Sequence, residues 1–339
     1  LVEFSESYGS DFERFVFDLM KAKDTLVKLP GADASRTSRA FRAGAWRTHR
    51  TGCRPVFFTP SDQAFKFVKK HIYIYSPSGA VRDKAAFRRG VARLKMLGHE
   101  VEIDEAALSS HLRFAGDDDT RLAAIHRAAA SGADVALISR GGYGLTRILG
   151  GIHYKSVAKA IDKGTQFVGL SDFTAFQLAV FAKTQRITWQ GPALGEDFGP
   201  ESEPDDIMQA CFDDLCLEQG EGTGWRMPHE MAKPVKVNNA VLWGGNLAVL
   251  TSLLGTPYFP AVKGGVLFLE DVGEHPYKVE RMLTQLLHAG VLGQQKAVLL
   301  GQFNRYQLVP HDKGFKLQSV VDWLRGQLPV PVLTGLPFG

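Results

Sequence analysis

The chain has 339 residues, a hydrophobic share of 45% and a formal net charge of +4 at pH 7. At ~100–200 residues per domain this length predicts two domains, and the hydrophobic share excludes a globally disordered protein. Six arginines and no acid lie between Ala34 and Ser61, so the rest of the chain is nearly neutral and its basicity does not indicate nucleic-acid binding. No apolar run reaches the ~18 residues of a membrane span, and three cysteines without metal-ligand spacing favour a reducing cytoplasm.

Residues 1–70 differ in pattern from the rest of the chain. Ser10 and Glu13 have the spacing of a capping box, and an apolar stripe predicts one amphipathic helix, made of Phe12, Phe15, Val16, Leu19 and Met20. The Arg-rich stretch that follows is interpreted as a solvated extension rather than a polyanion-binding arm. The start at Leu1 is consistent with a fragment or with added sequence, and we assign no role to residues 1–70.

From His71 onward, strand patterns alternate with helix patterns. Strands are predicted at residues 72–75, 101–103, 134–139 and 167–170, and helices at 84–97 and 120–130. This alternation predicts an N-terminal layered α/β domain over residues 71–200 with a largely parallel sheet.

A second domain is expected over residues 237–339, after a connection at 201–236 that is rich in acids and glycine. Its predicted strands lie at 266–269 and 297–300. The helix between them would have Pro276 in its first turn and Gly290 at its end.

Ser171 lies where the predicted strand 167–170 turns directly into a helix. This is the geometry of a nucleophile elbow, in which the tight turn exposes the hydroxyl and N–H groups at the helix start stabilise an oxyanion. The segment Gly169-Leu170-Ser171 keeps the first glycine of G-x-S-x-G but lacks the second. A serine that merely caps the helix remains the alternative.

Three glycines follow the predicted third strand, in the loop from Arg140 to Gly144. Neither the dinucleotide-binding pattern nor a phosphate-binding G-K-[ST] is present there. A tight turn is one interpretation. The other is a set of oxyanion donors beside Ser171, because loops at the carboxyl ends of one parallel sheet cluster together.

Glu270 and Asp271 end the apolar run 266–269, where two carboxylates need partners or solvent. Ordinary solvation or a cap for the next helix is one interpretation, and orientation of a catalytic histidine is the other. His275 is nearest in sequence, but its place beside Pro276 at a helix start is typical of a structural histidine. The residues alone identify no base and no metal site.

Seven segments together closely resemble the murein LD-carboxypeptidases, family S66 of the serine peptidases. In chain order they are SPSGAV, RFAGDDDTRL, ISRGGYGLTRIL, GLSDFTAFQL, ITWQGPALGEDFG, LWGGNLAVLTSLLGTPYFP and LFLEDVGEHPYKVERMLTQLLHAG. The resemblance runs from about His71 to Gly339 and leaves residues 1–70 outside. It implies a C-terminal domain with a β-barrel-like sheet, a homodimer, no cofactor, and a murein peptide as substrate.

The resemblance also implies roles for individual residues. Ser171 would be the nucleophile and Glu270 the carboxylate that orients the histidine. The N–H of Asp172 and a glycine of the Gly141–Gly142 pair would hold the oxyanion. Candidate substrate-binding residues are Arg140, whose alternative is pairing with a local acid, and Tyr143, Trp243 and Asn246.

The histidine of the resembled family directly follows a D-F-G-like motif. Here Leu336-Pro337-Phe338-Gly339 stands at that place, with proline for the usual acid, so the expected base would be the residue after Gly339. We therefore expect the 339-residue chain as it stands to be inactive. Two alternatives stay open: a self-immunity peptidase that cleaves peptidyl-nucleotide antibiotics, and a non-catalytic binding module on the same fold.

Overall fold

The computed structural model describes residues 4–5, 14–17, 68–218, 223–226 and 235–339. They belong to one compact unit formed from residues 1–22 and 68–339. The Arg-rich segment and the other compact unit, residues 23–67, lie outside the described residues. The predicted boundaries at residues 70, 200 and 236 stay predictions.

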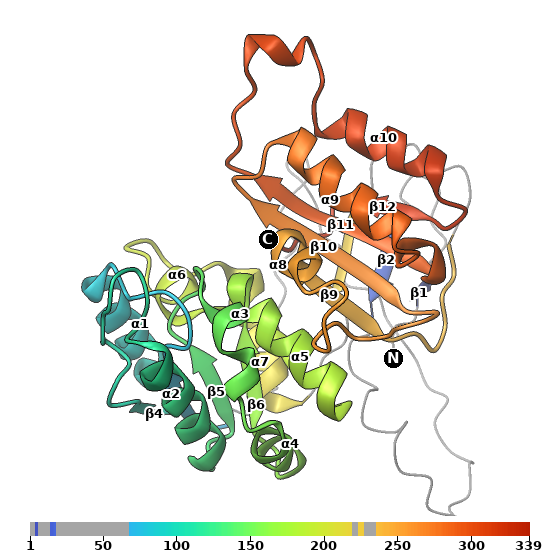
Figure 1. Cartoon of the computed structure of the whole chain (residues 1–339). Helices are drawn as coiled ribbons and strands as arrows, with labels where there is room; N and C mark the ends of the chain where they lie inside the picture. Colours follow the sequence, from blue (N-terminus) through green and yellow to red (C-terminus); the bar gives the residue numbers. More distant parts are fainter. Residues whose placement is uncertain (1–3, 6–13, 18–67, 219–222, 227–234) are drawn as a thin grey trace, which may run out of the picture. The chain divides into compact units, whose positions relative to one another are not determined.

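Five parallel strands form the first sheet, in the order β4-β3-β5-β6-β7 (Figure 1). They are β3 (His71–Tyr75), β4 (Glu100–Ile103), β5 (Val135–Ile138), β6 (Gln166–Gly169) and β7 (Trp189–Gln190). The four predicted strands are confirmed, with ends that differ by at most one residue. β7 was not predicted because it is only two residues long.

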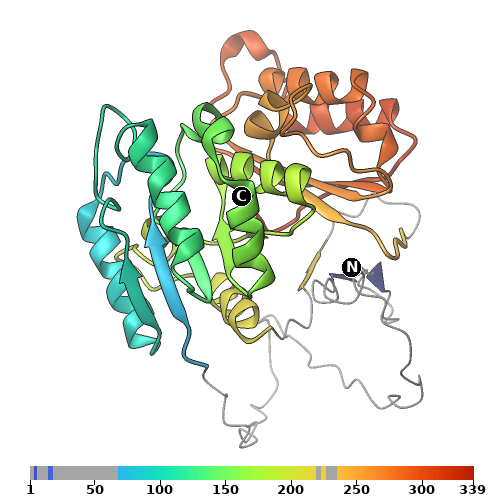
Figure 2. The same ribbon diagram turned by 60° about the horizontal axis from the view of Figure 1, so that its bottom comes forward.

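Helices cover both faces of this sheet, as Figure 2 shows. On one face lie α2 (Asp118–Ala130), α3 (Leu145–Ile148), α4 (Tyr154–Asp162) and α5 (Thr174–Thr184). On the other lie α1 (Lys84–Met96), α6 (Leu194–Asp197) and α7 (Asp206–Leu217). Side chains of β3 alternate accordingly, since Tyr73 and Tyr75 join the first cluster while Ile72 and Ile74 join the second.

The strand order creates a switch point between β3 and β5. The chain leaves β3 toward β4 on one side and later returns to β5 on the other. Loops that leave the carboxyl ends of two such strands diverge, which opens a crevice where α/β sheets bind their ligands. The loops after β3 and β5 both begin at this point, and β6 lies next to β5.

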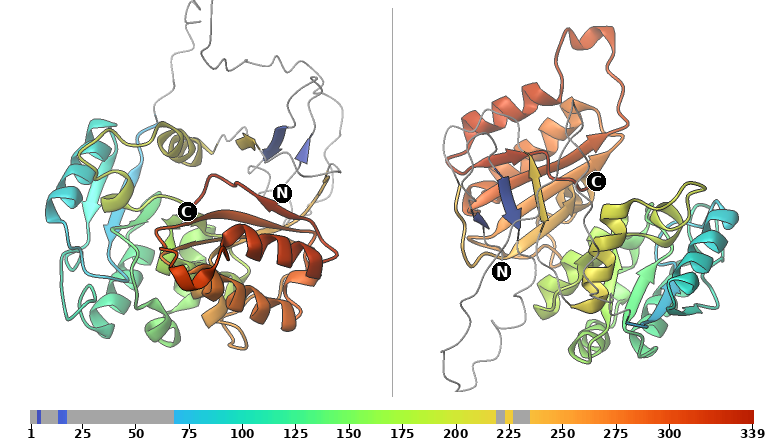
Figure 3. Two further views of the ribbon diagram at one scale, coloured as in Figure 1. Left: turned by 90° about the horizontal axis from the view of Figure 1, so that it is seen from above. Right: turned by 180° about the vertical axis from the view of Figure 1, so that it is seen from behind.

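The second sheet has four parallel strands in the order β12-β11-β10-β9. Its strands are β9 (Leu242–Asn246), β10 (Val266–Val272), β11 (Ala297–Asn304) and β12 (Val332–Thr334). Helices α8 (Leu247–Ser252), α9 (Pro276–His288) and α10 (Leu317–Gln327) pack on one face of it (Figure 3). Side chains of β10 again alternate, with Leu267 and Leu269 toward these helices and Val266 and Phe268 in a separate cluster.

The predicted mixed α/β class with largely parallel sheets is confirmed. The expected β-barrel-like sheet differs from the structure: the four strands of the C-terminal part form an open sheet that ends at β9 and β12. A four-stranded parallel sheet buries its apolar face against helices instead of closing on itself.

A small antiparallel sheet contains β1 (Phe4–Ser5), β2 (Arg14–Phe17) and β8 (Thr223–Arg226). The amphipathic helix expected near the N-terminus is therefore wrong for residues 14–17, and the rest of it lies outside the described residues. Backbone pairing with β8, which is remote in sequence, overrides the local helical pattern.

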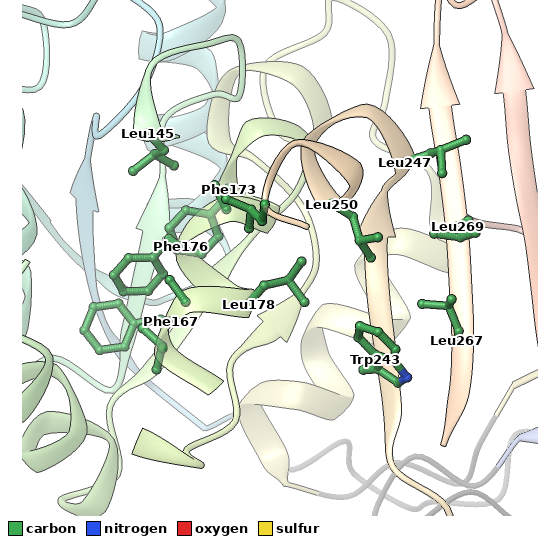
Figure 4. Close-up of a cluster of buried hydrophobic side chains, with 14 of the residues drawn as sticks. Leu145, Phe167, Phe173, Phe176, Leu178, Trp243, Leu247, Leu250, Leu267 and Leu269 are labelled. Atoms are coloured by element: carbon green, nitrogen blue, oxygen red, sulfur yellow. The ribbon is translucent and has the colours of Figure 1, made fainter. Parts of the chain in front are cut away.

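One apolar cluster contains residues of both parallel sheets and of the helices between them (Figure 4). Phe173 and Phe176 stack with ring centroids 4.8 Å apart at the start of α5. Trp243 of β9 and Leu247 and Leu250 of α8 belong to the same cluster. The junction that carries Ser171 is thus anchored in the core, and its backbone is held by packing on both sides.

Candidate active site

Ser171 occupies a strained turn between β6 and the helix that follows. Its φ is +61°, a left-handed conformation that is uncommon for serine, and the short 3-10 helix η3 (Ser171–Phe173) begins there and runs into α5. No side-chain cap hydrogen bond is made at the start of either helix, so the serine does not act as the cap considered from sequence. Such strain persists only where the surroundings enforce it, and it is typical of functional positions.

The glycine loop after β5 lies directly against Ser171. A Cβ added to Gly141 would lie 2.6 Å from Cβ and 2.7 Å from Oγ of Ser171, so no side chain fits there. The N–H of Gly79 donates to the carbonyl of Gly141 at 3.3 Å. Because a trans peptide points its N–H opposite to its C=O, the N–H of Gly142 points away from Gly79. Gly142 itself has φ +120°, which suits glycine.

Asp172 follows the serine, and its side chain is buried. The carboxylate accepts hydrogen bonds from the hydroxyl of Ser78 and from the N–H of Leu145, the latter at 3.0 Å. Burial raises the pKa of Asp172, against the effect of these two hydrogen bonds and of the Arg121 charge. Its side chain therefore joins the loops that follow β3 and β5.

Glu270 and Asp271 are both buried near the end of β10, but their surroundings differ. Asp271 accepts from Asn246 Nδ2 at 3.0 Å and from the N–H groups of Ala248 and Val272 at 2.9 Å, so it stabilises the start of α8. Burial first, and the charge of Asp271 second, raise the pKa of Glu270 to about 7, while a hydrogen bond from Asn246 lowers it. The sequence left both roles open for this pair. Asp271 caps α8, which precedes β10 in the chain, and the helix that follows the pair has His275 as its N-cap instead.

The segment that ends at Gly339 runs beside Glu270. The carbonyl of Phe338 accepts from the N–H of Gln302 at 2.7 Å, and its ring meets Phe268 edge to face. A Cβ added to Gly339 would lie 2.7 Å from Cβ and 3.2 Å from Cγ of Glu270. The backbone at residue 339 therefore lies against the aliphatic part of the Glu270 side chain.

Hydrogen bonds connect the end of β9 to the helix that follows Ser171. Asn246 N–H donates to Thr174 Oγ1 at 3.1 Å, and Gln190 Nε2 donates to Thr174 Oγ1 at 3.3 Å. Asn246 is also the register partner of Glu270 across β9 and β10. The Asn246–Thr174 hydrogen bond thus links the helix after the serine turn to the strand beside Glu270, which places the two strand ends in one region of the fold.

The remaining four candidate residues lie in different environments. Arg140 donates to the carbonyl of Ala80 at 3.1 Å and approaches Glu196 at 3.6 Å, so it has local partners. Tyr143 is 45% exposed beside the ring of Phe114. Asn246 is buried at the connection just described. Trp243 lies in the core, where its indole N–H donates to Gln295.

His275 acts as the N-cap of α9. Its ring is 3.1 Å from Asp312 through Nε2 and accepts from the N–H of Tyr277 at 3.4 Å. Both nitrogens are engaged locally, as expected for a structural histidine at a helix start.

Sequence reasoning did not assign roles to Ser78, Gly79, Arg121 and Thr174, although all four contact the residues of this region. A signal was present for the first two, because they lie in the turn after β3, at the same sheet edge as the other loops.

A hollow of about 580 Å³ lies at the opposite edge of the first sheet, near the starts of β3, β5 and β6. Its wall includes Lys70, Asp134, Lys159, Lys163 and Gln166, and it contains neither Ser171 nor Glu270. Within the described ranges, no group of three His, Cys, Asp or Glu side chains is placed to hold a metal ion. Among the described helices, none has the length and apolar composition needed to span a membrane.

The family descriptions that match this chain are LD-carboxypeptidase N-terminal domain, over residues 72–191, and LD-carboxypeptidase C-terminal domain, over residues 239–339. A probable murein peptide carboxypeptidase of Bacillus subtilis is 32% identical over 248 residues, which cover 73% of this chain and 76% of that protein. The crystal structure of a muramoyltetrapeptide carboxypeptidase from Oxalobacter formigenes is similar with a TM-score of 0.71 and 37% identity, covering 79% of this chain and 89% of the other.

A structure of the self-immunity protein MccF in complex with glutamyl sulfamoyl guanosine has a TM-score of 0.68. Its sequence identity is 22%, and the similarity covers 79% of this chain and 88% of that one. At this identity the likeness concerns the fold alone.

Proposed function

We infer, from the premise that the chain belongs to the LD-carboxypeptidase family, that it cleaves the L,D-peptide bond of murein tetrapeptides and releases the terminal D-alanine. Membership makes the protein a serine-type carboxypeptidase, a hydrolase. The observation that carries the proposal is the strained turn at Ser171 beneath a glycine loop that leaves no room for a side chain. Peptidoglycan recycling is the process that such a reaction would serve.

In the proposed reaction, Oγ of Ser171 attacks the carbonyl carbon before the terminal D-alanine while a base removes the hydroxyl proton. The carbonyl oxygen becomes an oxyanion, held by the N–H groups of Asp172 and of Gly141 or Gly142. The base then protonates the leaving amine as the C–N bond breaks. Water hydrolyses the resulting acyl-serine by the same steps and restores the serine hydroxyl.

We propose that Glu270 orients a histidine placed directly after Gly339. The contact between residue 339 and Cβ and Cγ of Glu270 supports this, because the next residue along the backbone would start beside the Glu270 side chain. Glu270 is buried without a cation among the groups that shift its pKa. An imidazolium ion at this place would stabilise the ionised carboxylate and lower its pKa.

The substrate-binding residues are also proposals. Arg140 would hold the terminal carboxylate of the peptide, in competition with Glu196, and Tyr143 would contact the substrate through its exposed ring. Asn246, the last residue of β9, would contact the substrate from the second sheet. The core position of Trp243 supports an indirect role at most.

We further propose a cytoplasmic homodimer that needs no nucleic acid, membrane or cofactor. The family resemblance is the basis for this, together with free thiols at Cys211 and Cys216. Light scattering of the purified protein measures the dimer, and a monomer at micromolar concentration would contradict it.

The test compares two substrates on the protein that includes the proposed histidine after Gly339, which is called the full-length protein below. We expect release of D-alanine from a murein tetrapeptide and little cleavage of a peptidyl-nucleotide amide. The reverse preference would favour the self-immunity activity. A chain that ends at Gly339 is expected to be inactive, and one extended by a histidine to be active. Labelling by a fluorophosphonate reports the serine itself, and its absence from the full-length protein would favour the binding module.

A further inference from the structure

Asp172 connects two loops to the nucleophile turn through its side chain. The residue is 1% exposed, and its carboxylate accepts from the Ser78 hydroxyl and the Leu145 N–H. Ser78 lies 94 residues away in the loop after β3, and Leu145 follows the loop after β5. One side chain next to Ser171 thus takes a proton donor from each loop.

Arg121 of α2 contacts the same two loops from its own position. Its side chain is fully buried, and Nη1 donates to the carbonyl of Gly144 at 2.8 Å and, more weakly, to that of Pro77 at 3.4 Å. Pro77 directly precedes Ser78, and Gly144 directly precedes Leu145. Each loop therefore offers a carbonyl to the guanidinium and, one residue later, a proton donor to the carboxylate.

Close packing fixes the same contacts. A Cβ on Gly144 would lie 2.6 Å from Nη1 of Arg121 and 2.8 Å from Cδ1 of Phe114, so this glycine is pressed against the arginine. The guanidinium also lies over the ring of Phe114, 4.7 Å from its centroid. Asp118 forms an ion pair with another nitrogen of Arg121. These contacts leave the guanidinium little freedom to move.

The held loops include the groups assigned to the oxyanion. Gly79, next to Ser78, donates to the carbonyl of Gly141 and so sets the direction of the Gly141–Gly142 peptide. Gly141 in turn touches Ser171. A donor that shifts by a fraction of an ångström loses much of its stabilising effect, because an oxyanion hole works by preorganisation.

We propose that Arg121 and Asp172 are paired positioning residues, which hold the loops 77–80 and 140–145 so that the peptide N–H of Gly142 stays directed at the oxyanion site. This rests on the proposed function, because it assumes that an oxyanion forms beside Ser171. Neither side chain is required to touch the substrate. The pair acts through the two loops that it connects.

Asp104 and Arg127 provide a matched control within the same sheet. Arg127 Nε and Nη2 donate to the buried Asp104 carboxylate at 2.7 and 2.9 Å, and the hydroxyl of Tyr73 donates at 2.6 Å. This pair also joins a helix to a strand end, but none of these partners belongs to the loops beside Ser171. Loss of a buried acid is thus separable from loss of the loop connection.

The experiment measures kcat, KM and thermal unfolding for the full-length protein with Asp172→Ala, Asp172→Asn, Ser78→Ala or Asp104→Asn. Removing one oxyanion donor typically lowers kcat by ~10²–10³-fold, so Asp172→Ala is expected in that range with KM nearly unchanged. Ser78→Ala, which deletes one hydroxyl, should lose about 10-fold, and Asp172→Asn, which keeps an acceptor oxygen, should recover part of the loss. Asp104→Asn should keep kcat and lower only the unfolding temperature.

Two results would overturn the pairing. One is a wild-type kcat in both Asp172→Ala and Ser78→Ala, and the other is a loss of kcat in these two folded variants that is no larger than the loss in Asp104→Asn. The rate of Ser171 labelling by a fluorophosphonate separates this proposal from the substrate assignment. If the wild type is labelled but releases no D-alanine, the substrate is wrong, and the same ranking of labelling rates still supports the pair. A wild type that is not labelled would overturn both.

Discussion

Two regions of the molecule bury carboxylates with opposite consequences. At the end of β4, Asp104 is 3% exposed, and burial alone would raise its pKa, but hydrogen bonds from Arg127 and Tyr73 outweigh that effect and lower it. In β10, Glu270 is 6% exposed, and burial together with the charge of Asp271 raises its pKa to about 7. The two carboxylates are buried to a similar degree, but Asp104 is paired with Arg127, whereas the neighbouring charge at Glu270 is the acid Asp271.

The difference separates a structural acid from an acid available for chemistry. Asp104 is held ionised by a guanidinium fork and has no capacity left for another strong partner. Glu270 lies where an additional cation would be favourable, beside a backbone segment that reaches residue 339. Perturbed acids without a cationic partner are typical of functional sites.

The largest expected contrast concerns activity in the full-length protein. Glu270→Gln should lower kcat by ~10³–10⁴-fold, as when the carboxylate that orients a catalytic histidine is neutralised. Asp104→Asn should leave kcat of the folded protein within about 2-fold, because its partners lie apart from the loops at Ser171. Steady-state release of D-alanine measures both. Equal losses in the two variants would remove the distinction.

The next contrast compares two glycines. Gly141→Ala places a methyl group against Cβ and Oγ of Ser171, so we expect kcat/KM to fall by ~10²-fold, as for a small displacement of reacting groups. Gly293→Ala is the control, because no atom lies within 4 Å of its added Cβ. It should keep kcat/KM. A fully active Gly141→Ala variant would argue against a glycine loop that must lie close to the serine.

The two acids should also respond to pH in opposite directions. Glu270 has a raised pKa, so the stability linked to its protonated form is complete below about 4.5 and is lost as pH rises through about 7. Between pH 5 and 8, Glu270→Gln should therefore gain ~1–3 kcal/mol relative to the wild type, reduced by coupling to Asp271. Denaturant unfolding at several pH values in the chain ending at Gly339 measures this. A constant difference would show that Glu270 does not titrate in that window.

For Asp104, the same experiment should give a pH dependence of the unfolding free energy with the opposite sign. Its lowered pKa means that its stabilising effect is present above the unfolded pKa, near 4, and is lost as pH falls through the lower folded value. Asp104→Asn should thus cost ~1–3 kcal/mol at pH 7, less than a fully buried pair because Arg127 is about one third exposed. This cost should shrink below pH 4. A cost that persists unchanged in acid would indicate lost packing rather than lost charge.

The smallest expected effect is on the backbone at Ser171. Glycine tolerates a φ of +61° without the strain that serine and alanine bear, so Ser171→Gly should be more stable than Ser171→Ala by about 1 kcal/mol. Both variants lack the proposed nucleophile, which leaves stability as the difference to measure. The control pair is Gln177→Gly and Gln177→Ala inside α5, where glycine should be the less stable residue.

Much of the fold followed from local patterns. The alternation of strand and helix from His71 onward predicted parallel sheets, since side-chain periods of 2 and 3.6 are properties of the chain itself. The same patterns misassigned residues 14–17, where pairing with residues 223–226 decides the conformation. They also did not distinguish the open second sheet from a barrel-like one, because closure depends on the tilt and number of strands rather than on any single strand.

The sequence by itself determined that a serine follows a buried strand at a sharp junction, and that a glycine loop and a pair of acids lie at the ends of two other strands. Tertiary structure alone decided which groups act together: Asp271 caps α8, no cation is among the described groups that shift the pKa of Glu270, and Ser78 is joined to Asp172 across 94 residues. Periodicity and turn chemistry are local and can be read along the chain. Hydrogen-bond partners and desolvation depend on which distant segments pack together, and they exist only once the chain has folded.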